Sequence, residues 1–170
     1  DIADYDIQDA LTISVWVKPN SIQTNTIIDR TADIYGTNGG AGLDGYNLSL
    51  RSQVGTGEPD QEGAVYASFG PSSGNDFAIS PPNSYMPNEW IHITGVWKNN
   101  NYVKLYINGV LISQTSTNYS FNTDKPLEFA RVNYGNYQGG YLHGNIDEVI
   151  IWNHALDSTQ IQSYMSTPPT

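Results

Sequence analysis

The run Leu11-Thr12-Ile13-Ser14-Val15-Trp16-Val17-Lys18 decides the fold class of this chain. Its odd positions are apolar and mostly β-branched, and Pro19-Asn20 ends the run. Successive side chains of a β-strand point to opposite faces, so this alternation predicts a strand with one face in the core and one in water. The same alternation recurs along most of the chain, and it predicts an all-β protein.

Two local sequence patterns, one typical of a hairpin turn and one typical of a helix N-cap, add to this prediction. Asn108-Gly109 supplies the two positive-φ residues of a type I′ turn, so residues 102–107 and 110–114 are expected to form a hairpin. Asp157 followed by Gln160 has the capping-box pattern, which predicts a short helix near residues 158–165. Other strands are predicted at residues 46–51, 65–69, 90–97, 127–132 and 144–153.

Long turn-rich stretches separate these strands, at residues 32–45, 55–63, 70–88 and 133–140. Loops of this length are either functional or tolerated insertions. We expect residues 1–167 to form one domain and residues 168–170 to begin a linker or tail.

The composition excludes several classes of function. Seven basic against 17 acidic side chains give a formal charge of −10, and no basic cluster offsets it, so we set aside nucleic acid and anionic membrane surfaces. The absence of Cys excludes disulfides, thiolate zinc sites and a Cys nucleophile. Only 14% of residues are charged, which leaves a neutral polar surface typical of carbohydrate-facing proteins and of secreted bacterial proteins in general.

The chain also has no run of about 20 apolar residues of the kind that forms a membrane helix. It opens directly in a strand-like segment without a signal peptide. We therefore expect a module of a longer, secreted protein.

The order of these segments resembles the laminin-G-like, concanavalin A-like jelly-roll superfamily. The resemblance rests on residues 11–19, on Tyr46-Asn47-Leu48-Ser49-Leu50, on the Trp90-Ile91-His92 strand, on the 104–110 hairpin and on the closing run 144–156. It implies a two-sheet antiparallel jelly-roll sandwich with one short helix near the C-terminus. The superfamily includes lectins, carbohydrate-binding modules, adhesion domains, glycoside hydrolases and polysaccharide lyases, so it does not by itself select a function.

Catalysis is the least favoured of these functions. Retaining glycosidases need two carboxylates about 5 Å apart. Asp147 and Glu148 are adjacent in a predicted strand and would point to opposite faces, and the strand motifs expected of lyases of this fold are absent. We therefore predict no catalytic residue.

A calcium site is implied by the resemblance alone. Asp147 matches the closing-strand aspartate that often helps to hold a structural calcium in this superfamily. Asp4, Asp6 or Asp44 could supply further oxygens, although nothing in their spacing selects one. The alternative is that Asp147 only caps a strand or pairs with a cation.

Carbohydrate binding is the favoured function. Sugar rings stack on aromatic faces, while Asn, Arg and His bind the hydroxyls. The first candidate site is the outward face of a sheet, if the strands concerned are neighbours: Asn47, Ser49, Arg51, Tyr66, His92, Thr94 and Tyr106. The second is a set of loop residues: Arg30, Tyr35, Arg131, Tyr134, Tyr137 and Tyr141.

Each candidate has a purely structural alternative. Tyrosines are favoured in strands and can pack on their own domain, Arg30 can pair with Asp29 or Asp33, and His92 can be a satisfied histidine of the sheet face. We predict a non-catalytic carbohydrate-binding module for an extracellular polysaccharide, attached to a secreted bacterial polysaccharide-degrading enzyme. The alternatives are an adhesion or protein-interaction domain and, third, a lyase or glycoside hydrolase.

Overall fold

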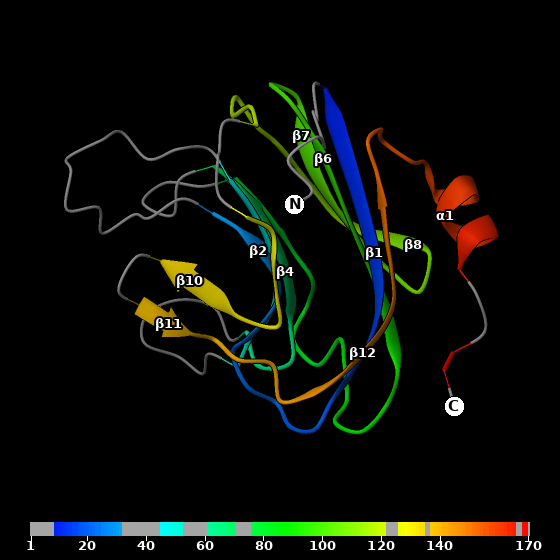
Figure 1. Cartoon of the computed structure of the whole chain (residues 1–170). Coiled ribbons are helices and arrows are strands. Elements are labelled where there is room, and N and C mark those ends of the chain that lie inside the picture. Colours follow the sequence, from blue (N-terminus) through cyan, green and yellow to red (C-terminus); the bar gives the residue numbers. More distant parts are fainter. Residues whose placement is uncertain are drawn as a thin grey trace.

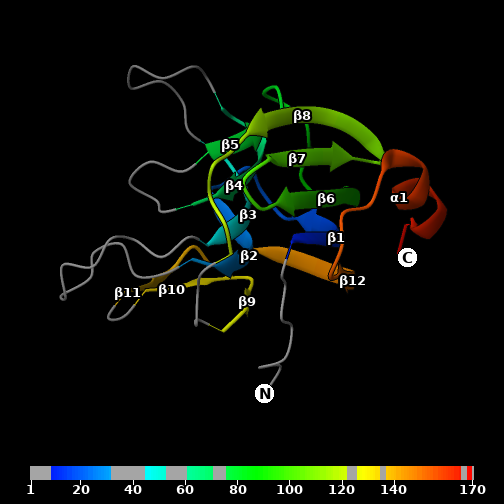
Figure 2. The same ribbon diagram turned by 90° about the horizontal axis from the view of Figure 1, so that it is seen from above.

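The computed structural model describes residues 9–31, 45–52, 61–70, 76–121, 126–134, 137–165 and 168–169, without the side chains of residues 133–138. Two five-stranded sheets face each other with the core between them (Figures 1 and 2). All neighbouring strands within each sheet are antiparallel. The predicted all-β jelly-roll sandwich is confirmed.

We call the first sheet sheet A. Its strand order is β12 (Gly144–Trp152), β1 (Ala10–Pro19), β6 (Ile91–Lys98), β7 (Tyr102–Ile107) and β8 (Val110–Ser116). Asn108 and Gly109 have φ of 49° and 75°, so the predicted hairpin turn between β7 and β8 is confirmed.

Sheet B has the strand order β5 (Asp76–Ile79), β4 (Val65–Phe69), β3 (Tyr46–Leu50), β2 (Asn25–Arg30) and β9 (Glu128–Phe129). A separate two-stranded ribbon, β10 (Val132–Tyr134) and β11 (Tyr137–Gly139), lies on the side of sheet B that faces away from sheet A (Figure 1).

The prediction of one strand over residues 127–132 is wrong. Ala130 has φ of 60°, which ends the extended backbone of β9, and the chain then turns before Val132 begins β10. The strands β2 and β5 and the ribbon were not predicted either. β5, β10 and β11 have at most four residues each and adjoin or lie in stretches rich in turn residues, and β2 lacks a clear alternation of polar and apolar residues.

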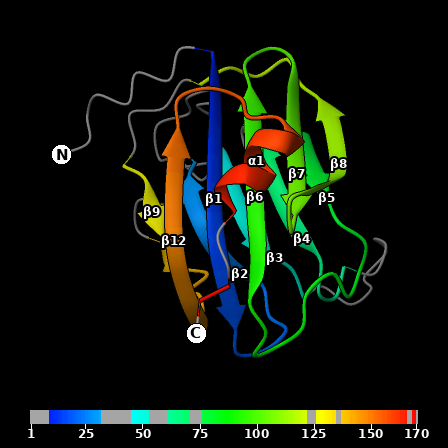
Figure 3. The same cartoon turned by 90° about the vertical axis from the view of Figure 1, so that its right-hand side faces the viewer.

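Helix α1 (Ser158–Tyr164) covers part of the outer face of sheet A (Figure 3). Asp157 accepts a hydrogen bond from the Gln160 backbone N–H, and the Gln160 side chain accepts one from the Asp157 N–H, so the predicted capping box is confirmed. Leu156 and Ile161 bury their side chains against Val96 and Tyr106 of the sheet. Among the described residues, no helix has the length and apolar character needed to cross a bilayer.

The core between the sheets holds the apolar positions of the alternating strands. Trp97, Tyr46 and Phe69 are among its largest fully buried side chains. Burial of each large apolar side chain contributes about 2 kcal/mol, so this layer stabilises both sheets together. At one edge Thr115 of β8 donates a hydrogen bond to the Phe77 carbonyl of β5 at 2.6 Å, which ties the two sheets together.

Candidate functional site

The outer face of sheet B carries a polar and aromatic row of side chains. Asn47 and Ser49 on β3 pair across the ladder with Ser68 and Tyr66 on β4. Ser68 in turn pairs with Phe77 on β5. Because directly paired residues share a face, these side chains lie on one surface, opposite the buried Leu48 and Ala67.

An aromatic stack occupies this face. The Tyr66 and Phe77 rings have centroids 5.1 Å apart and planes inclined by 29°. The Arg51 guanidinium carbon lies 4.0 Å from the centroid of the Tyr66 ring. Tyr66 is therefore flanked by one residue from each neighbouring strand. Tyr66 itself is only 8% exposed, whereas Phe77 is 43% exposed, so Phe77 presents the accessible part of the stack.

A hydrogen-bonded carboxylate lies on the same face. Asp29 on β2 is 2% exposed and accepts hydrogen bonds from the Thr31 hydroxyl at 2.9 Å and the Asn47 amide at 3.0 Å. Burial raises the pKa of Asp29, while the bonds from Asn47 and Thr31 act in the opposite direction. Asn47, a predicted ligand residue, therefore uses at least one of its amide hydrogens within the protein.

Asp29 also has a carboxylate neighbour that alternation along single strands did not reveal. Glu128 on β9 is its Cα partner across the ladder, and its charge contributes to the raised pKa of Asp29. Side chains directly opposite each other have Cβ atoms about 5 Å apart, so these two acidic side chains are near neighbours. Glu128 is held by Arg131 at 2.8 Å and Asp29 is buried, so neither carboxylate is presented to a substrate.

The prediction that His92, Thr94 and Tyr106 share this surface is wrong. They belong to β6 and β7 of sheet A, while Asn47, Ser49, Arg51 and Tyr66 belong to sheet B. Alternation places each of these side chains on the outer face of its own sheet. The outer faces of sheet A and sheet B, however, point in opposite directions. Arg51 and Tyr66 therefore lie on the far side of the sandwich from His92.

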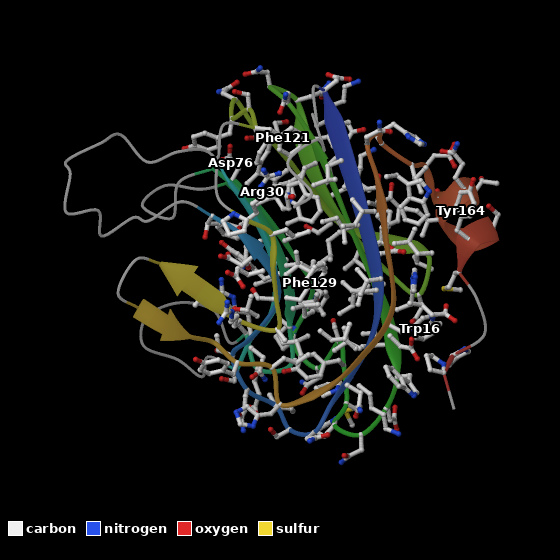
Figure 4. All side chains as sticks on the ribbon, in the orientation of Figure 1. Trp16, Arg30, Asp76, Phe121, Phe129 and Tyr164 are labelled. Atoms are coloured by element: carbon white, nitrogen blue, oxygen red, sulfur yellow. The ribbon has the colours of Figure 1, made fainter. Side chains whose placement is uncertain are left out.

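The outer face of sheet A is also buried rather than open to water. His92 and Thr94 are 4% and 0% exposed, and Tyr106 packs under α1. Trp16 pairs with His92 across β1 and β6, with ring centroids 5.1 Å apart, and Figure 4 shows Trp16 on the side of sheet A away from sheet B. Within the described structure, Trp16 Nε1, His92 Nδ1 and Thr94 Oγ1 are buried without a hydrogen-bond partner.

This environment fixes the charge state of His92. Burial lowers its pKa from 6.5 to about 4, and the negative charge of Glu148 opposes only part of that change. The imidazole is therefore neutral at neutral pH. The alternative interpretation of His92 as a satisfied histidine of the sheet face agrees with its position, but its Nδ1 has no hydrogen-bond partner within the described structure.

The described residues of the second candidate site, the loop residues, also have separate partners within the protein. Arg30 lies at the upper end of the sandwich, and its side chain hydrogen-bonds the core residue Tyr46 (Figure 4). Arg131 pairs with Glu128, and this bond raises the pKa of Arg131. Tyr141 is 51% exposed and also interacts electrostatically with Arg131. Tyr35 and the side chains of Tyr134 and Tyr137 lie outside what the structure describes.

Asp147 is exposed and accepts a hydrogen bond from the Glu148 N–H at 2.8 Å. Glu148 has φ of 48° in a β-bulge, which interrupts the strict alternation expected for this pair. In the described ranges no group of three or more His, Cys, Asp or Glu side chains is placed to hold a metal ion. Asp4, Asp6 and Asp44 lie outside those ranges, so calcium binding stays a prediction.

The fold and its strand order agree with a comparison against protein families. A family model described as the concanavalin A-like lectin/glucanases superfamily matches residues 2–162. The chain belongs to this superfamily. A stretch of 92 residues is also 30% identical to the human adhesion G-protein coupled receptor D1, covering 52% of this chain and 10% of the receptor. The matched stretch thus spans about a tenth of that relative's length.

Solved structures of similar fold include carbohydrate-binding domains. The CBM40 of the Ruminococcus gnavus IT-sialidase, solved with α2,3-sialyllactose, superposes with a TM-score of 0.68 at 14% identity, over 91% of this chain and 82% of that one. Domain 4 of AbnA, an extracellular arabinanase of Geobacillus stearothermophilus solved with arabinotriose, gives 0.60 at 24% identity, over 94% and 68%. At these identities the likeness establishes the lectin-like fold alone.

Two residues of the outer face of sheet B were missed from the sequence. Phe77 lies in a stretch rich in Gly, Pro and Ser, and the apolar run Phe77-Ala78-Ile79 has no polar alternation that would place Phe77 on an outward face. Asp29 was considered only as a partner of Arg30. Its role depends on Asn47, which is 18 residues away in the chain, so no local pattern reveals it.

Proposed function

We propose that this chain binds a carbohydrate on the outer face of sheet B without catalysing a reaction. The observation that carries this proposal is the stack of Arg51, Tyr66 and Phe77. Its exposed phenylalanine offers an apolar surface to the C–H face of a sugar ring, and the Arg51 guanidinium, which lies against the adjoining Tyr66 ring, offers donors to hydroxyl or carboxylate oxygens. Apolar platforms with a few placed polar groups are the usual form of small-ligand sites.

The comparisons support the carbohydrate as ligand class. Two structurally similar domains were solved with an oligosaccharide, and both come from proteins described as carbohydrate-active enzymes. We extend the proposal to a secreted bacterial module that recognises an extracellular polysaccharide. Joined to a polysaccharide-degrading enzyme, it would raise the local concentration of that enzyme on its polymer.

A second candidate function is adhesion or protein interaction. The observation that favours it is the sequence match to a human adhesion receptor. In that case the exposed Phe77 would contact a protein surface, because exposed aromatic residues are enriched at protein interfaces as well.

An affinity-gel screen of the isolated domain against neutral and acidic polysaccharides tests the proposal, with calcium and again with a chelator. We expect retardation by at least one polysaccharide. Loss of retardation with chelator would support the calcium prediction for Asp147. Retardation by none of the polymers would contradict carbohydrate binding and favour the adhesion alternative, and new reducing ends would show that the domain is an enzyme.

A further inference from the structure

The backbone of Arg51 is hydrogen-bonded within sheet B, whereas its side chain has no acidic partner in the part of the chain that the structure describes. Its N–H donates to the Ala64 carbonyl at 2.9 Å, and its carbonyl accepts from the Gly63 N–H at 3.0 Å, so the β3–β4 ladder continues through this residue. The phenol of Tyr85 also donates to the Arg51 carbonyl, at 3.4 Å. Alternation from Asn47 and Ser49 directs the Arg51 side chain to the outer face of sheet B.

The guanidinium of Arg51 has no carboxylate partner among the described residues, and the ion pairs of Lys98 with Asp9 and of Arg131 with Glu128 do not involve it. Within the described structure, Arg51 Nε is buried without a hydrogen-bond partner. A buried donor without an acceptor costs free energy, and the cost is larger for a charged group.

We infer that the carbohydrate ligand carries an anionic group, a carboxylate or a sulfate, which pairs with the Arg51 guanidinium while a sugar ring rests on Phe77. This inference rests on the proposed function and names the class of its ligand as an acidic polysaccharide. A guanidinium binds either anion through two parallel hydrogen bonds.

The net charge of the chain does not favour an anionic ligand. The net charge of −10 repels an anionic polymer at long range, so preference for it must come from contacts at short range. Arg51 lies against the Tyr66 ring, which in turn stacks on the exposed Phe77, and it is therefore placed to supply such a contact on the same face. Lys104 makes a similar cation–π contact with Tyr102, at 4.2 Å, but on β7 of the opposite sheet.

The test uses two matched pairs of polymers that separate the two anions. Polygalacturonate is compared with its fully methyl-esterified form, and carrageenan with agarose, by affinity electrophoresis of the whole domain. We expect tighter binding, by about tenfold, to the anionic member of at least one pair. Arg51→Gln should abolish that preference, Arg51→Lys should keep a weaker preference because the charge remains, and Lys104→Gln should behave as the wild type. Circular dichroism verifies that each variant is folded.

Several outcomes would overturn the inference. Equal binding within both pairs, or no binding to any of the four polymers, would show that no anion is recognised. A preference that survives in folded Arg51→Gln would assign the recognition to another residue. If neutral polysaccharides still bind in the wider screen, carbohydrate binding stands and only the acidic ligand is wrong. If no polysaccharide binds at all, the proposed function fails as well.

Discussion

The indole N–H of Trp97 donates a hydrogen bond to the backbone carbonyl of Ser68 at 2.8 Å. Trp97 lies on β6 of sheet A and Ser68 on β4 of sheet B, so a single side chain joins the two layers through the core. β4 also carries Tyr66. The position of the strand that carries Tyr66 of the proposed site therefore depends on a residue of the opposite sheet.

The space for the Trp97 ring is provided by Gly95. A Cβ atom at position 95 would overlap Trp97 Cη2 and lie 2.7 Å from Cζ3. Trp97 is fully buried and cannot move aside, so we expect Gly95→Ala to lower the free energy of unfolding by about 3 kcal/mol. Urea unfolding measures the change. In a Trp97→Leu background the same substitution should cost much less, and equal costs in both backgrounds would contradict this explanation.

Asp29 stabilises the outer face of sheet B through its hydrogen bonds. Asp29→Ala removes the acceptor of the Asn47 and Thr31 donors, so we expect a loss of about 2 kcal/mol in thermal or urea unfolding. Asp29→Asn keeps an acceptor oxygen and removes a charge that burial disfavours, so it should cost less than half as much. Asp9→Ala, which breaks an exposed ion pair with Lys98, is the control and should cost under about 0.5 kcal/mol. Similar losses for all three variants would contradict the assigned role.

His92 should make the stability of the domain depend on pH. Its pKa is about 4 in the folded protein and near 6.5 when unfolded, so between these values the unfolded state binds the additional proton. The contribution of His92 to the free energy of unfolding is therefore full above pH 6.5. It falls as the pH drops towards 4, by about 2 kcal/mol.

The measurement is the unfolding free energy of the wild type and of His92→Phe at several pH values between 4 and 7. The variant keeps an aromatic ring beside Trp16, and it should show a flatter dependence than the wild type. His143→Phe, at an exposed position, is the control and should follow the wild-type curve. A His92→Phe curve parallel to the wild type would show that this histidine is not the titrating group.

Phe77 should contribute directly to binding. On a polysaccharide that the wild type binds, we expect Phe77→Ala to weaken affinity about tenfold, because it removes the exposed ring of the stack. Tyr164→Ala is a matched control, since Tyr164 is 55% exposed and packs against Trp152 with ring centroids 5.3 Å apart on the α1 side of the molecule. If both variants weaken binding equally, or neither does, the outer face of sheet B is not the site.

Alternation predicted most of the fold because it is a local property. The inward positions Ile91, Ile93 and Trp97 and the outward positions His92 and Thr94 are where the pattern put them. Alternation does not say which sheet a strand joins, however, since strand order depends on contacts between distant segments. His92 was for this reason grouped with Tyr66, although the two residues lie on opposite sides of the sandwich.

The candidate site was predictable only in part for the same reason. Arg51 and Tyr66 were found because polar and apolar residues alternate along residues 46–51 and 65–69, whereas Phe77 lies on an edge strand without such alternation and was not. Alternation also could not predict how much of each outward side chain is exposed to solvent. Ser49 and Tyr66 point outward as expected but are only 5% and 8% exposed, because elements distant in sequence decide what covers a sheet.

The pairing of β1 with β12 has a consequence for how the protein is made. Thr12 donates a hydrogen bond to the His154 carbonyl, 142 residues further along the chain. From Thr12 to Pro19, β1 also pairs with β12. During translation β1 must wait, with one edge unpaired, until β12 has also left the ribosome. We expect slow completion of sheet A and a tendency of chains that end before β12 to aggregate through that open edge.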